Sequence, residues 1–365
     1  MQVRVYRSFE ELPQSFIEGN RFPAQRDYFQ SNQWYSNLFE NVLCNELDLR
    51  VYIVFADGST EAIEGALFCG KVRGEKKLVS LTNYYSLEYG PVYCGKDPDK
   101  SAIVEKLIDY ISREKPAWNV VELRFLHSGS QQYKKFIQSF RNAGFYPHEF
   151  FQYENWFYPI NEKSFSDYYV ERPSKLKNTI KRKGNKLRSG YDLQIKFYIS
   201  DDAELEAGIR AFIAVYDSSW KNSEPHPQFV PQLMRSCAGL GNLFLGVMYL
   251  DSNPVAAQLW LSTASKFIIY KLAYDEGYKN LSVGSILSKN MFEEIFNRCE
   301  YSEIDYGIGS EAYKRDWMSD VRLVGGISAY NKKTCNGFMN ACYQQLKTGV
   351  KKIGLGRRSA NRQSS

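Results

Sequence analysis

Three side chains near the C-terminal end of the chain have the types and spacing that acid–base chemistry needs. Asp305 ends a strand-like segment beside Gly307, and Tyr313 and Lys314 follow on a short helical segment. A carboxylate beside a glycine at the end of a strand is a common place for a reacting group in α/β folds. Asp305 would accept a proton, Tyr313 would donate one, and Lys314 would hold an acidic substrate or orient Asp305. The alternative is structural: Asp305 pairs with Lys314, and Tyr313 packs in the core.

A helix is predicted to begin near Gly284, after a loop that starts at Tyr274. Apolar residues recur from Leu287 at helical spacing, so the helix should pack on a sheet. Ser282 occupies the N-cap position, and Gly284 and Ser285 allow close approach to the backbone. A helix N-terminus presents unpaired N–H groups that favour an anion such as phosphate. A capped helix that binds no ligand is the alternative.

These residues lie in the second of two similar series of elements, each with the order β-β-β-α-β-α-β. The first series is predicted at 49–56, 61–72, 76–82, 101–114, 119–126, 131–143 and 145–160. The second is predicted at 242–250, 255–262, 267–274, from 284 onward, 301–307, 310–317 and 321–330. Three antiparallel strands followed by a strand-helix-strand step predict an α+β fold, a mixed sheet flanked by helices. We therefore expect two tandem domains, 1–160 and 161–348, and a disordered basic tail over 349–365.

Composition limits the class of protein. The chain has 365 residues, of which 44% are hydrophobic and 24% are charged, as in ordinary globular proteins. Seven scattered cysteines without a Cys-x-x-Cys pair argue for reduced thiols, for a cytoplasmic protein and against a metal site. No signal sequence or run of 18 apolar residues is present, so we expect no membrane span, while peripheral membrane contact stays open.

The net charge of +6 comes from two segments. Residues 172–188 carry eight basic side chains and 347–365 carry six, and neither segment has an acidic one. For 172–188, one interpretation is a solvated amphipathic helix. The others are contacts with the phosphates of a nucleotide cofactor, an acidic acceptor or tRNA.

The second half resembles a known family. Pro254-Val255-Ala256-Ala257, Gly284-Ser285-Ile286-Leu287 and Ile304–Gly309 with Tyr313-Lys314 resemble acetyltransferases of the GNAT superfamily, in its cellulose-biosynthesis-associated (CelD/BcsL-type) branch. Ser219-Trp220-Lys221 also fits. The resemblance covers about 170–330. The first half resembles the degenerate partner domain of tandem GNAT and Fem-type transferases. Ser282-Val283-Gly284 departs from the Ser-Pro-Gly-like helix opening that we would expect.

The resemblance implies direct transfer of an acyl group from acetyl-CoA or another acyl-CoA, without a metal. The pantetheine would add like a strand between 267–274 and 301–307. Asp305 would be the base, Tyr313 the acid, and Lys314 their partner. The donor would be held by Leu272, Ala273, Tyr274, Ser282, Val283, Gly284, Ser285, Ile286 and Leu287.

The acceptor would be an amine or hydroxyl of a sugar, a polysaccharide precursor or a related metabolite. Aromatic rings suit sugar stacking, so the acceptor residues expected are Trp34, Tyr85, Tyr89, Trp220 and Lys221. Two other functions stay open. A Fem-type enzyme would take its acyl group from aminoacyl-tRNA, and nucleic acid is expected as a partner only in that case. An inactive pair of domains would act as a binding or scaffold protein.

Overall fold

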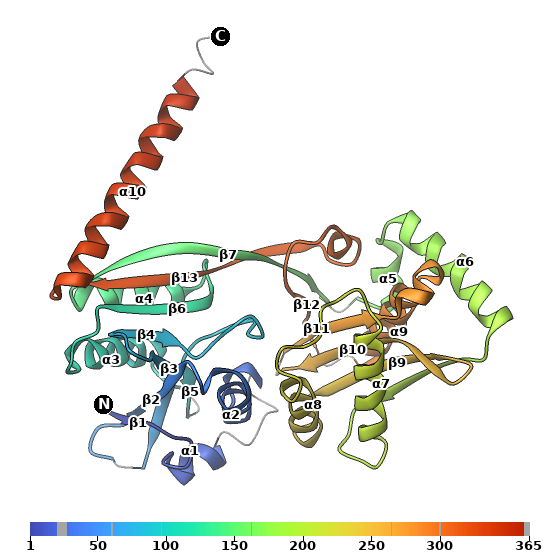
Figure 1. Cartoon of the computed structure of the whole chain (residues 1–365), viewed down its shortest axis with the longest axis horizontal. Helices are drawn as coiled ribbons and strands as arrows, with labels where there is room; N and C mark the ends of the chain where they lie inside the picture. The colour runs from blue at the N-terminus through green and yellow to red at the C-terminus, as the bar shows by residue number, and fades with distance from the viewer. Residues whose placement is uncertain are drawn as a thin grey trace. The chain divides into compact units, whose positions relative to one another are not determined.

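The computed structural model of the chain describes residues 1–19, 28–59, 61–95, 97–161, 163–263, 265–298 and 301–360 (Figure 1). These residues form two compact units. Unit 1 comprises Met1–Phe16, Leu43–Gln152 and Leu323–Ser365. Unit 2 comprises Ile17–Val42 and Tyr153–Arg322.

Unit 1 is a mixed sheet with helices packed on it. The strand order is β1-β2-β3-β4-β6-β13, with β5 beside β3, and β4 and β6 are parallel. Its elements are β1 Gln2–Tyr6, α1 Gln14–Gly19, β2 Leu47–Phe55, β3 Ile63–Val72, β4 Lys77–Ser80, β5 Val92–Tyr93, α3 Lys100–Arg113, β6 Val120–His127, α4 Gln131–Asn142, β7 Phe145–Pro159, β13 Asp320–Asn331 and α10 Cys335–Ala360. Three of these elements are shared with unit 2: α1 and β7 end in unit 2, and β13 begins there.

Unit 2 has the same plan. Its strand order is β7-β12-β11-β10-β9-β8, and β11 and β12 are parallel. Its further elements are η2 Tyr28–Gln30, α2 Asn32–Leu38, η3 Phe39–Leu43, α5 Phe165–Val170, α6 Ser174–Gly190, β8 Leu193–Tyr198, α7 Leu205–Asp217, α8 Phe229–Gly239, β9 Leu243–Leu250, β10 Asn253–Ser262, β11 Lys266–Tyr274, η4 Glu276–Leu281, α9 Val283–Arg298, β12 Glu303–Ile308 and η5 Ala312–Asp316. The expected fold class, a mixed sheet flanked by helices, is confirmed, and the predicted order of strands and helices occurs in both halves.

The units are not the two continuous ranges expected from the sequence, because each half donates its last strand to the other sheet. The end of β7 pairs with β12 in unit 2, and β13 pairs with β6 in unit 1. The segment Ile17–Val42 also belongs to unit 2, where Asn37 Nδ2 donates to the Phe229 carbonyl at 3.2 Å. Instead of one boundary at residue 160, the chain passes between the units within β7 and again within β13.

The C-terminal segment forms α10, and the boundary expected at residue 349 falls inside this helix. The part of the expected tail at 361–365 lies outside the described residues. Within the described chain, no helix combines the length and the apolar composition that crossing a bilayer requires.

The core of unit 2 holds α9 against the sheet. Phe292 stacks on Tyr168 and on Trp317, with ring centroids 5.2 and 5.0 Å apart, and meets the edge of Trp260. A Cβ atom at Gly246 on β9 would come within 2.7 Å of Met291 Sδ, so this glycine lets α9 approach the strand closely. This packing sets the position of the N-terminal end of α9.

Candidate functional site

The parallel strands β11 and β12 pair over their first three residues and then part. Their pairing in the described chain runs from Lys266 with Glu303 to Ile268 with Asp305, although β11 continues to Tyr274. On the other side of β12, its register with β7 shifts after Asp305, and Gly307 in this stretch has a φ of +64°. The end of β12 therefore leaves backbone groups of β11 available to an extended ligand.

The 3-10 helix η4 connects β11 to the N-terminus of α9. Ser282 has a φ of 55°, and the first backbone bond of the helix runs from the Ile286 N–H to the Ser282 carbonyl. The N–H groups of the first helical residues therefore point out of the helix end. Val283 is fully buried, whereas Gly284 is half-buried, so the contact offered to a ligand here is mainly backbone.

Gly284 lies directly against an aromatic pair. A Cβ atom at Gly284 would be 3.1 Å from Cδ1 of Tyr274. The Tyr274 ring in turn packs on Trp220, whose centroid is 4.6 Å away and which is 49% exposed. The structure thus brings together Trp220, Tyr274 and the start of α9, which lie far apart in the sequence.

Lys221 reaches the backbone of β11 beside this pair. Its Nζ donates to the Leu272 carbonyl at 2.6 Å. Burial lowers the pKa of Lys221 to about 8, and the positive charge of Lys271 lowers it further, while Glu224 opposes both effects. An amine with this pKa is present in both protonation states near neutral pH, as a proton acceptor in an enzyme requires.

Lys314 and Tyr313 occupy different environments on η5. Lys314 is 3% exposed, and its ammonium donates to the carbonyls of Ile308 and Gly309 and pairs with Glu311 at 3.0 Å. Tyr313 is 43% exposed, and burial of its hydroxyl raises its pKa above the ordinary value. Tyr313 is therefore protonated at neutral pH, whereas Lys314 holds the loop after β12.

Asp305 is enclosed by partners. Oδ1 accepts from Asn155 Nδ2 at 2.6 Å and from the Gly307 N–H at 2.7 Å. Oδ2 pairs with Arg322 and lies 3.7 Å from Lys266 Nζ. This geometry fits the structural alternative for Asp305, with the difference that the paired cations are Arg322 and Lys266 rather than Lys314.

Three of the five expected acceptor residues are buried within their own units. Trp34 is fully buried in unit 2, where its ring contacts Phe29, Phe229 and Tyr270. Tyr89 is 4% exposed and donates its hydroxyl to the Phe68 carbonyl, and Tyr85 is 2% exposed. These three rings are core residues, so among the expected acceptor residues only Trp220 and Lys221 lie at the site.

Several polar residues at or near the site were not predicted. Gln258 is 1% exposed and donates to the Gly284 carbonyl at 3.1 Å and to Ser288 Oγ at 2.7 Å. Lys271 pairs with Glu224, and both influence Lys221. A polar residue inside an apolar strand was the available signal for Gln258 and Lys271. Glu224 lies in a polar segment and carried no such signal, and Asn155 lies in the aromatic strand β7 beside other polar residues.

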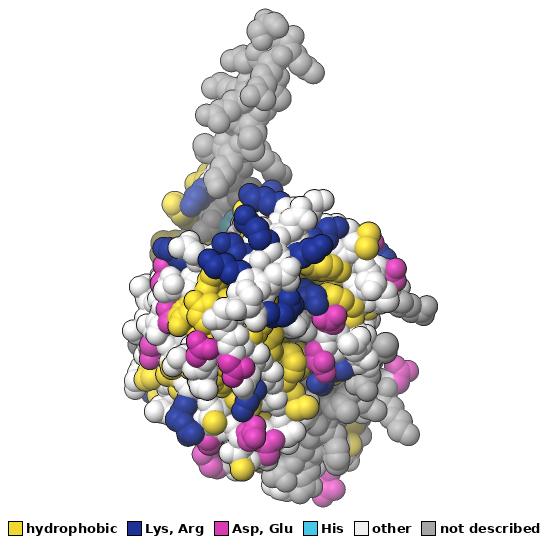
Figure 2. Space-filling model, turned by 90° about the vertical axis from the view of Figure 1, so that its right-hand side faces the viewer, with side chains coloured by type: hydrophobic (Ala, Val, Ile, Leu, Met, Phe, Trp, Pro, Cys, Tyr) yellow, Lys and Arg dark blue, Asp and Glu magenta, His cyan; other side chains and the backbone are white. Residues whose placement is uncertain are grey.

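The predicted basic segment forms α6, whose apolar side is buried through Ile180 and Leu187. Lys and Arg side chains gather on the face that carries α6 (Figure 2). Among the described residues, its exposed cations Lys175, Lys181, Arg182 and Lys186 make no ion pair with a carboxylate. The cations therefore remain available to an anionic partner.

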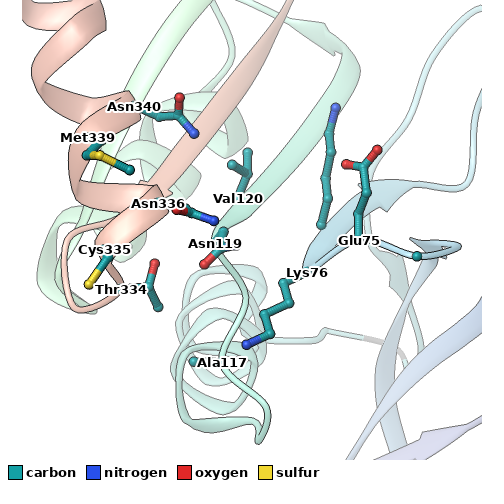
Figure 3. A pocket seen from close by; sticks show the side chains of 12 residues that line it. Glu75, Lys76, Ala117, Asn119, Val120, Thr334, Cys335, Asn336, Met339 and Asn340 are labelled. Carbon is teal, nitrogen blue, oxygen red and sulfur yellow. The ribbon is translucent and has the colours of Figure 1, made fainter.

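A separate cavity of about 810 Å³ lies in unit 1 at the start of α10 (Figure 3). Polar side chains such as Lys76, Asn119 and Asn336 line it, and none of the expected site residues does. Within the described ranges, no group of three or more His, Cys, Asp or Glu side chains could hold a metal ion.

Replacing Asp305 distinguishes a structural role from a catalytic one. Asp305→Ala should lower the free energy of unfolding by about 3 kcal/mol, because it removes the buried carboxylate that accepts from Asn155 and balances the charges of Arg322 and Lys266. Urea unfolding measures this change, and Asp201→Ala, at an exposed position of the same unit, is the control and should change stability little. If Asp305→Ala unfolds like the parent chain and only turnover falls, the structural role is wrong.

Comparison with known proteins identifies the domain. Residues 174–315 match the family model described as acetyltransferase (GNAT) domain. The structure is similar to the crystal structure of FemX, with a TM-score of 0.60 at 10% identity, covering 90% of this chain and 97% of that chain. It is also similar to a conserved protein of unknown function from Bacteroides thetaiotaomicron, with a TM-score of 0.55 at 14% identity over 90% and 100% of the chains. For L-PGS from Bacillus licheniformis the TM-score is 0.51 at 12% identity over 88% and 97%.

At these identities the structural matches show a shared fold, and no curated protein sequence matches the chain. The family match covers the strands, the α9 N-terminus and η5 that form the site. Residues 174–315 are therefore similar to the acetyltransferase (GNAT) domain.

Proposed function

We propose that unit 2 transfers an acyl group directly from an acyl-CoA, with acetyl-CoA as the first candidate, to an amine or hydroxyl acceptor. The parting of β11 and β12 beside the N-terminus of α9 carries this proposal. The pyrophosphate of the donor would lie on the N–H groups between Ser282 and Leu287, and the pantetheine along Leu272–Tyr274. The fit comes from the backbone, because Val283, Ile286 and Leu287 are buried in the core.

The chemical step needs a proton acceptor and a proton donor. The acceptor nitrogen would attack the thioester carbonyl carbon, forming the C–N bond as the C–S bond breaks. We assign the role of proton acceptor to Lys221, which would take the proton of the attacking amine. Both carboxylate oxygens of Asp305 already bind Asn155, Arg322 or Lys266. The thiolate that leaves would take its proton from Tyr313, which is exposed and protonated at neutral pH.

The acceptor proposed is an amine or hydroxyl of a sugar or polysaccharide precursor, as in the CelD/BcsL-type resemblance. The exposed ring of Trp220 supports a stacking contact with a sugar. An acceptor screen with amino sugars and simple amines, read as release of free thiol, tests this assignment. Thiol release with simple amines and none with any sugar would contradict it.

Donor binding tests the proposed site directly. Gly284→Val should weaken CoA binding at least about tenfold, because the new side chain fills the space beside Tyr274 and blocks approach to the helix end. Isothermal titration with CoA measures the affinity. Gly239→Val is the matched control, since nothing lies within 4 Å of a Cβ atom there. Equal CoA affinity in the Gly284 variant and the parent chain would show that the donor binds elsewhere.

The pH dependence tests Lys221. Its pKa of about 8 means that the neutral, proton-accepting form increases as pH rises through 8. The value of kcat/KM should therefore rise with pH and level off above about pH 8, and Lys221→Met should lower it by roughly 10²- to 10⁴-fold and remove the rise. Lys279→Met, at an exposed position of η4, is the control and should keep the parent profile. A Lys221→Met variant with the parent pH profile would exclude the role as base.

A second candidate function is transfer from an aminoacyl-tRNA, as Fem-type enzymes perform. The exposed cations of α6 favour it, since a dense basic face suits an RNA backbone. Under this alternative, tRNA binding should weaken steeply as the salt concentration rises. The double variant Lys181→Gln with Lys186→Gln should lower the slope of log affinity against log salt concentration by about two. Tight CoA binding without measurable tRNA binding would exclude it. A chain that binds neither donor would be a binding or scaffold protein.

A further inference from the structure

The first turns of α10 are held on unit 1 by one face of the helix. A Cβ atom at Gly337 would come within 2.2 Å of the Asn331 carbonyl oxygen, so this turn lies against the end of β13. Ala341 is 3% exposed, and Gln344 Nε2 donates to the Tyr330 hydroxyl at 3.4 Å. The side chains on the docked face are thus small or polar.

The opposite face carries three large apolar side chains, while Phe338, which is 53% exposed, lies between the two faces. Met339, Tyr343 and Leu346 are 60%, 60% and 71% exposed. Their i, i+4, i+7 spacing places them in one stripe, about half a turn away from the docked residues Gly337 and Ala341. An ordinary surface helix buries its apolar side, so the amphipathicity of α10 is inverted relative to the unit that holds it.

The charge of α10 indicates what covers this stripe. The helix carries Lys347, Lys351, Lys352, Arg357 and Arg358, and Cys335–Ala360 contains no acidic residue. In the sequence, the apolar spacing continues at Val350 and Ile353. A helix with an exposed apolar stripe and only basic charges has the composition of helices that lie in the interface of an anionic bilayer.

We propose that α10 binds the surface of an anionic lipid membrane through the stripe Met339–Tyr343–Leu346. A second copy of the chain fits less well, because pairing two such helices brings like charges together. A nucleic acid would use the cations but would leave the apolar side chains in water.

Co-sedimentation of the full chain with vesicles tests this proposal. The parent chain should bind vesicles of mixed phosphatidylcholine and phosphatidylglycerol, and it should bind vesicles of phosphatidylcholine alone much more weakly. Leu346→Asn should reduce binding to the mixed vesicles by about tenfold, because it removes an apolar side chain that lipid would cover. Lys351→Gln with Lys352→Gln should reduce it by at least a similar factor, and the loss should be smaller at high salt.

Gln345→Ala is the matched control, since this residue is exposed on α10 but lies outside the stripe. Its vesicle binding should equal that of the parent chain. Equal binding by the parent chain and Leu346→Asn would overturn the proposal, as would no preference for anionic vesicles. A dimer in sedimentation velocity that Leu346→Asn dissociates would instead assign the stripe to a second copy.

Discussion

The site depends on one buried carboxylate. Asp305 lies where the pairing between β11 and β12 ends, and it accepts bonds from Asn155 of β7 and from the backbone of Gly307. Arg322 at the start of β13 and Lys266 of β11 balance its charge. A buried carboxylate is stable only with such partners, so the four strand segments must meet at this point. The constraint holds β12 at the point where its pairing with β11 ends.

Beyond the end of the β11–β12 pairing, the candidate site combines backbone groups with a small set of cations. The helix end at Gly284 and the open stretch of β11 offer N–H and carbonyl groups, while Lys221, Lys271 and Lys314 lie nearby together with Glu224 and Glu311. A surplus of positive charge suits a donor that carries phosphates. Burial also lowers the pKa of Lys221, so the proposed donor site and the proposed proton acceptor share one environment.

Strand exchange explains why the two halves of the sequence do not fold as two separate ranges. Each half contributes its last strand to the sheet of the other, so that β7 completes the edge of β12 and β13 that of β6. An unpaired edge at β12 would leave backbone groups without partners, and the exchanged strand satisfies them. The same exchange delivers Asn155 and Arg322 to Asp305, which links the architecture to the site.

The sequence by itself determined the strands and helices and their order. Period-two and period-3.6 patterns located these elements, while the contact of Trp220 with Tyr274 and the reach of Lys221 to β11 came from the fold. The tertiary structure alone decided which strands pair across the halves, because several registers satisfy the same apolar pattern. It also decided the partners of Asp305 and the burial of Trp34, Tyr85 and Tyr89. A ring on an apolar face has the same local pattern whether a core or a ligand covers it, and only the packing of distant segments distinguishes the two.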